Sequence, residues 1–76
     1  MRDLLLTIAK NLVDNPGQLE IIEEINGGIT TLKLKVAPED MGKVIGKQGR
    51  IARSIRTVIK AAAIHENVRV NVEIVQ

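Results

Sequence analysis

Two stretches of this chain alternate strictly between apolar and polar residues, and they bracket a segment whose apolar residues recur at helical spacing. Leu32 to Val36 alternates with lysines, and Val68 to Ile74 alternates with polar residues near the C-terminus. A period of two is typical of a strand with one buried face. A sheet with one apolar face needs a cover, and the helical segments can supply it. The sequence therefore predicts an α+β fold.

The N-terminal half is predicted to form a helix and a hairpin. Helical spacing predicts a helix over residues 2–14, which the turn Asn15-Pro16-Gly17 ends. An isoleucine-rich strand follows over 19–25, with an imperfect alternation that either a bulge or an edge position could explain. The turn Asn26-Gly27-Gly28 then leads into the strand that ends at Val36. We expect these two strands to pair in an antiparallel hairpin.

The C-terminal half is predicted to form two helices and a third strand. Pro38 begins a short helix that runs to about Ile45, and a longer helix continues to about His65. The last strand covers 68–74. The predicted order is α-β-β-α-α-β, with a three-stranded sheet covered on one face by helices. With 76 residues, residues 1–76 should form a single domain.

Composition excludes several classes of function. The chain has no Cys and only one His, His65, so disulfides, thiolate metal sites and His-rich metal sites are excluded. No Ser/His/Asp set suggests itself, and we expect no catalytic residues, no metal and no cofactor, hence no enzyme. No apolar run could span a membrane and the N-terminus is a poor signal peptide, so a cytoplasmic location is expected. Aromatic residues are absent, which disfavours RNA-binding surfaces built on aromatic stacking.

Charge is divided unevenly along the chain. The segment from Met41 to His65 has no acid, and its basic residues are Lys43, Lys47, Arg50, Arg53, Arg56 and Lys60. Solvated helix faces usually mix the two signs. A basic segment without acids is typical of a surface that binds a polyanion.

The stretch Gly46-Lys47-Gln48-Gly49 interrupts this basic segment between the two predicted helices. Gly46 should let the first helix end abruptly, and Gly49 should do the same at the start of the next. The second helix then begins with free N–H groups that favour an anion. Arg50 and Arg53 would extend a phosphate track on that helix, and Lys43 lies one turn before the loop. The pattern predicts a phosphate-binding loop.

The sequence Val44-Ile45-Gly46-Lys47-Gln48-Gly49-Arg50-Ile51-Ala52, with the Arg- and Ala-rich helix after it, resembles a KH domain of type II. Over its whole length the chain is similar to the small bacterial KhpA (YlqC-like) family. The resemblance implies binding of about four nucleotides of single-stranded RNA, with the Gly46–Gly49 loop clamping the backbone. The RNA-binding residues expected from the motif and its surroundings are Lys43, Val44, Ile45, Gly46, Lys47, Gln48, Gly49, Arg50 and Arg53.

The resemblance also bears on the apolar surface under the bases and on partners. Val44, Ile45 and Ile51 could line either the groove or the core. Many KH domains have a large aliphatic residue where this chain has Ala52, so the groove floor should be shallower or shifted. The family is similar to RNA chaperones and post-transcriptional regulators, which implies a complex with a KhpB-like KH protein and a role in cell shape and envelope growth.

Two other binding functions remain open alongside RNA binding. The helix end from Val58 to Ile64 is apolar nearly all round, so it could serve a homodimer or a heterodimer, or else lie buried under the first helix. Two helices with a Gly turn and a basic second helix also occur in duplex-DNA helix-turn-helix modules. A nucleotide-binding P-loop is excluded, because Gly42 and Gly46 have three residues between them and Lys47 is followed by Gln48.

Overall fold

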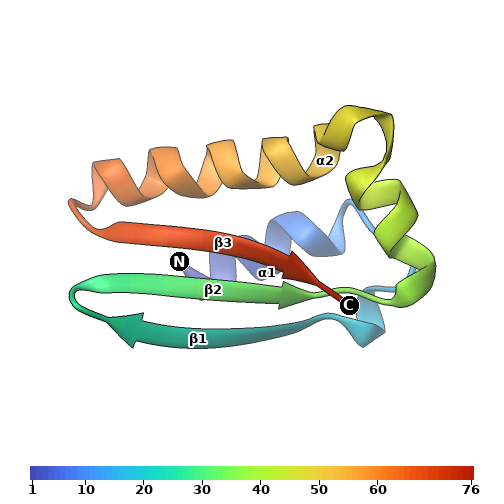
Figure 1. Ribbon diagram of the computed structural model, residues 1–76. Helices are drawn as coiled ribbons and strands as arrows, with labels where there is room; N and C mark the ends of the chain where they lie inside the picture. Colours follow the sequence, from blue (N-terminus) through green and yellow to red (C-terminus); the bar gives the residue numbers. More distant parts are fainter.

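The three predicted strands form one sheet in the order β1-β2-β3 in the computed structural model, which describes residues 1–46 and 48–76 (Figure 1). The strands are β1 (Glu20–Asn26), β2 (Ile29–Lys35) and β3 (Arg69–Val75). The predicted hairpin is confirmed, because β1 pairs antiparallel with β2. Strand β3 pairs parallel with β2, and the helix between them provides the long crossover connection that parallel neighbours need.

The position of strand β1 in the sheet explains why its apolar and polar residues alternate imperfectly. Its pairing with β2 runs without a break from Glu20 opposite Lys35 to Asn26 opposite Ile29, so the register leaves no room for a bulge. Strand β1 lies at the edge of the sheet. There Ile21 points into the core, whereas the neighbouring Ile22 is exposed on the other face. The edge position is therefore the correct explanation of the two predicted alternatives.

Helix α1 (Arg2–Lys10) is shorter than predicted. The expected end at residue 14 is wrong because Asn11 ends the helix, with its side-chain Nδ2 donating to the carbonyl oxygen of Thr7 at 2.8 Å. Asparagine side chains that bond nearby backbone compete with the helical ladder in this way. A short 3-10 helix at Pro16–Gln18 then leads into β1.

The two predicted C-terminal helices form one bent helical element, α2 (Pro38–His65). Its backbone turns left-handed at Gln48 (φ 63°) and Gly49 (φ 68°), and Figure 1 shows the bend where the ribbon turns from green to yellow. We call residues 38–46 the first arm and residues 50–65 the second arm. The two arms correspond to the two helices that the sequence predicted.

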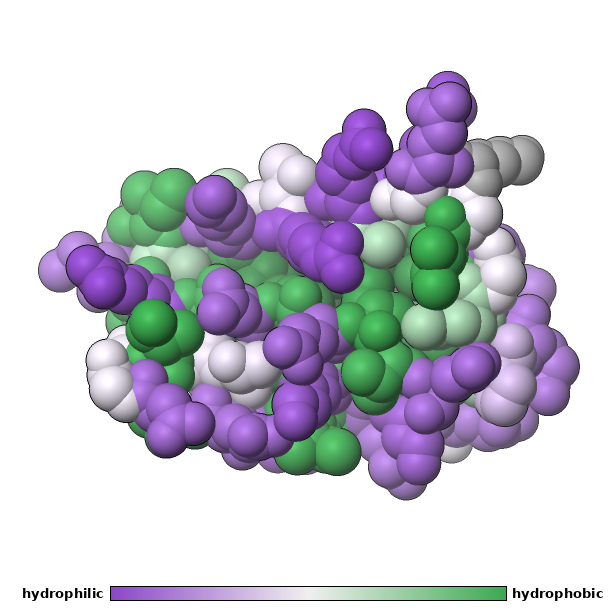
Figure 2. Space-filling model, in the orientation of Figure 1, coloured by the Kyte–Doolittle hydropathy of each residue, from purple (hydrophilic) through white to green (hydrophobic). Residues whose placement is uncertain are grey.

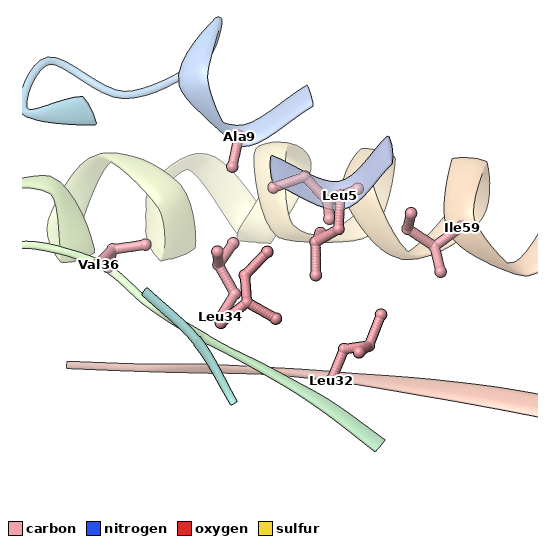
Figure 3. Close-up of a cluster of buried hydrophobic side chains, with 8 residues drawn as sticks. Leu5, Ala9, Leu32, Leu34, Val36 and Ile59 are labelled. Atoms are coloured by element: carbon pink, nitrogen blue, oxygen red, sulfur yellow. The ribbon is translucent and has the colours of Figure 1, made fainter. Parts of the chain in front are cut away.

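The core lies between the sheet and both helices (Figure 3). Its largest fully buried side chains come from the sheet and from both helices: Leu5 from α1, Leu32 and Leu34 from β2, and Ile55 and Ile59 from the second arm. Full burial of each such side chain stabilises the fold by about 1.5–3 kcal/mol. The sheet's other face has polar side chains, including the ion pair of Lys33 Nζ and Glu24 Oε1 at 2.7 Å. In the described part of the chain, no helix is both long enough and apolar enough to cross a membrane.

Candidate nucleic-acid interface

The bend in α2 is built on two left-handed residues, Gln48 and Gly49. Gly46 was expected to end the first helix, but it keeps a helical backbone, and Gln48 makes the turn instead. A left-handed conformation is free for glycine and costs about 1–2 kcal/mol for a residue with a Cβ. The strain is therefore concentrated at Gln48.

The two glycines of the loop face open space. A Cβ added at Gly46 or at Gly49 would meet no atom within 4 Å. Packing inside the chain therefore does not explain glycine at position 46, whose backbone is helical. A glycine on an open surface allows the backbone of another molecule to approach closely.

The second arm follows directly after the bend, within the same helical element. The backbone also changes hand between Gly49 and the helical Arg50, and such a change of hand gathers successive N–H groups into an anion-binding concavity. The exposed side chain of Arg50 adds a positive charge. This end of the helix is suited to a phosphate group.

A hollow of about 320 Å³ lies beside the bend, lined by Gly42, Lys43, Gly46, Arg50 and Ile51. Lys43 therefore lies where the sequence analysis expected it, one turn before the loop. Gly42 was missed. It shares one helix face with Gly46, four residues later, and a Cβ at Gly42 would also meet nothing within 4 Å. Gly42 could have been found from the sequence, because two glycines four residues apart in a helix mark one open face.

Two acids outside the basic segment reach this site through the fold. Lys43 Nζ lies 3.2 Å from Oδ1 of Asp14. Asp40, whose carboxylate is buried, accepts bonds from the backbone N–H of Asp14 at 3.1 Å and of Asn15 at 3.0 Å. Burial raises the pKa of Asp40, but these bonds, a third from the Asn15 side chain and the charge of Lys43 outweigh it and hold the pKa below its ordinary value. Asp40 thus ties the first arm to the chain that follows α1.

The apolar candidates divide between core and surface. Val44 is fully buried, and it packs with Val13 and Ala52. The position expected to shape the groove floor, Ala52, is therefore part of the core. Ile45 is 51% exposed, and Ile51 is half-buried and lines the hollow beside the bend. Ile45 and Ile51 are the aliphatic side chains available to a ligand here.

The arginines of the second arm reach backbone carbonyls. Arg53 Nη2 donates to the carbonyl oxygen of Gln48 at 3.2 Å, and Arg56 Nε donates to that of Val72 at 3.3 Å.

Arg56 and Lys60 line a hollow of about 410 Å³ between α2 and the free edge of β3, with Val70 and Val72 among its apolar walls. Figure 2 shows the hydrophobic side chains between α2 and the sheet on this face of the molecule, with hydrophilic side chains lying across them. The predicted site residue Lys47 lies outside the described residues.

A helix bent at Gly-x-x-Gly that connects two parallel strands of a three-stranded sheet, preceded by a helix and a hairpin, defines a KH domain of type II. The sequence model described as "KhpA/KhpB, KH domain" matches residues 2–74. The chain belongs to this family.

Several relatives match the chain from end to end. It is 64% identical over 75 residues to "RNA-binding protein KhpA" of Clostridium acetobutylicum, which covers 99% of this chain and 100% of the relative. It is 60% identical over 75 residues to the protein of the same name from Caldanaerobacter subterraneus subsp. tengcongensis, and 59% over 75 residues to that of Clostridium perfringens, again covering 99% of this chain and 100% of each relative. No solved structure gave a significant match.

Proposed function

We propose that this chain binds single-stranded RNA and that the bend of α2 clamps the RNA backbone. The observation that carries the proposal is the open face at Gly46 and Gly49, next to the left-handed turn and the exposed Arg50. The relatives named as RNA-binding proteins support the same ligand. No catalytic step is part of the proposal.

A phosphate group would lie against the N–H groups that begin the second arm. The glycines let the sugar-phosphate chain approach, while Lys43 and Arg50, which both line the hollow, supply positive charge. The next bases would then lie on aliphatic surface, beginning at Ile45 and Ile51. An aliphatic surface suits this chain because it has no aromatic residue on which bases could stack.

The decisive variant is the double substitution Lys47→Asp and Gln48→Asp. Asp tolerates the left-handed region better than most residues, so we expect the fold, measured by circular dichroism, to stay intact. Binding of a short single-stranded RNA, measured by fluorescence anisotropy, should be lost. Wild-type affinity should fall steeply with salt, by about 0.7 log units per log unit of salt for each phosphate contact.

A matched control changes the charge equally at the far end of the molecule. Arg69→Asp with Asn26→Asp has the same change in net charge, at the hairpin tip opposite the bend (Figure 1). This control should bind RNA far better than the loop variant. Retained binding in the loop variant would reject the clamp, and tighter binding of duplex DNA than of single-stranded RNA would favour the helix-turn-helix alternative.

We further infer that the chain pairs with a second KH domain, a copy of itself or a KhpB-like protein, through residues 58–64. Val58 and Ile64 are 44% and 72% exposed, and the small side chains of Ala61 and Ala62 between them would allow a partner to approach closely. Light scattering at micromolar concentration should show a homodimer that Ala62→Arg dissociates. A monomer that Ala62→Arg leaves unchanged would count against self-association.

The cellular role follows from the mode of binding. Because phosphate contacts hold a strand without reading its sequence, we infer an RNA chaperone that acts on many transcripts as a post-transcriptional regulator in the cytoplasm. We also propose a role in cell shape and envelope growth, which the resemblance of the sequence to the KhpA family implies. Annealing of complementary RNA strands should be accelerated by the wild type and not by the loop variant; equal acceleration by both would exclude this role for the bend.

A further inference from the structure

The left-handed backbone at Gln48 needs a restraint. Gln48 has φ 63°, and glutamine lacks both the freedom of glycine and the short side chain that lets Asn or Asp adopt this region. A carbonyl at the end of a helical arm also lacks an assured partner within the helix. The first arm therefore ends in a conformation that its own residues do not stabilise.

The restraint comes from the second arm. Arg53 Nη2 donates to the carbonyl oxygen of Gln48 at 3.2 Å, across the bend. A guanidinium presents its donors in a fixed plane, whereas the ammonium of a lysine is a flexible point charge. The bond is charge-assisted and so stronger than one between neutral groups. It joins the second arm to the bend.

We propose that Arg53 is a positioning residue, which holds Gln48 and Gly49 in the left-handed turn that presents the loop to RNA. This inference rests on the proposed function, because the turn matters only if the loop binds a ligand. It assigns Arg53 a role different from the phosphate contact that the sequence analysis gave it. Arg50, whose side chain lines the hollow beside the bend, keeps the role of a phosphate contact.

The substitution Arg53→Lys separates the two roles because it keeps the charge. A positioning role predicts that Arg53→Lys weakens RNA binding about tenfold, equivalent to about 1.4 kcal/mol, with an unchanged salt dependence. Arg53→Gln should weaken binding similarly, again without a change in slope. The matched control Arg50→Gln should instead lower the slope by about 0.7, the value for one lost phosphate contact on a single strand.

A second substitution that restores binding shows that Arg53→Lys acts through the turn and not through a loss of overall stability. Gln48→Asn favours the left-handed region, so Gln48→Asn with Arg53→Lys should regain most of the affinity, measured against each single variant in a double-mutant cycle. The amide resonances of Gln48 and Gly49 should also shift in Arg53→Lys without RNA. Wild-type affinity in Arg53→Lys, or additive effects in the cycle, would overturn the proposal. If the wild type binds no RNA, the proposed function fails, and the amide shifts still report whether Arg53 holds the turn.

Discussion

The two arms of α2 both use small residues, but for opposite reasons. In the second arm, Ala52 and Ala63 face inward and are buried. In the first arm, Gly42 and Gly46 line an open hollow, and a side chain at either would meet nothing within 4 Å. The alanines are small because the rest of the chain packs against them. The glycines leave room for something that is not part of the chain.

The contrast distinguishes the small residues of α2 that serve stability from those that are available for binding. Glycine in a helix interior costs up to about 1 kcal/mol relative to alanine, and the first arm has two glycines, Gly42 and Gly46, without an internal reason. A chain selected for stability alone would have alanine there. Gly42 and Gly46 are therefore the positions of the first arm where substitutions can change binding without harming the fold.

The largest effect that tests this comparison is expected from Gly46→Ala. The added methyl group should leave the fold as stable or raise its stability by up to about 1 kcal/mol, because the backbone at 46 is helical and the space is open. It should weaken RNA binding about tenfold or more, because the strand can no longer approach. Thermal unfolding and fluorescence anisotropy on the same samples measure the two effects.

Gly17→Ala is the control for Gly46→Ala. Gly17 lies in the short 3-10 helix, and a Cβ there would also meet nothing within 4 Å. It is separate from the hollow beside the bend, so RNA affinity should stay at the wild-type value. If Gly46→Ala binds RNA as well as Gly17→Ala does, the open face of the first arm is not the binding surface.

Most of the fold could be predicted because its signals are local. The alternation in β2 and β3, the turn residues of the hairpin and the helical spacing of the second arm are all readable along the chain. The early end of α1 was missed because it depends on the side chain of Asn11 bonding to Thr7. The sequence alone did not establish the strand order or the parallel pairing of β3 with β2.

The site could be predicted only in part, because its electrostatics are not local. The stretch Gly46–Gly49 indicated where α2 bends, whereas the role of the charged residues around it stays a prediction. The contact of Asp14 with Lys43 joins residues 29 apart, and the bonds from the backbone N–H groups of Asp14 and Asn15 to Asp40 span 26 and 25 residues. Only the folded chain brings these groups together. The left-handed turn lies at Gln48 rather than at Gly46, and Arg53 from the second arm donates to the carbonyl oxygen of Gln48.

The arms also differ in how they are attached to the rest of the molecule. The second arm is anchored by Ile55 and Ile59, both fully buried in the core. The first arm has one buried valine, Val44, and the carboxylate of Asp40, which accepts bonds from the chain after α1. Apolar burial does not depend on pH, whereas a carboxylate does. Acid should therefore loosen the first arm before the second.

The smallest effect that tests the comparison is expected from Asp40→Asn. The pKa of Asp40 is below its ordinary value of about 3.9, so its charged form stabilises the native state. That contribution is fully present above about pH 4 and is lost as pH falls through the lowered pKa. The amide oxygen of the introduced asparagine can still accept a backbone bond, so Tm at neutral pH should fall only modestly. Wild-type and variant Tm values should then converge as pH falls below about 4.

The exposed Glu66, just beyond the second arm, provides the matched control. Glu66→Gln removes one carboxylate without touching the first arm, and its Tm should follow that of the wild type across the whole pH range. A gap between wild type and Asp40→Asn that stays constant down to about pH 2 would show that the charge of Asp40 contributes nothing. In that case the first arm would be held by packing around Val44, as the second arm is held by its isoleucines, and the two arms would not differ in their response to acid.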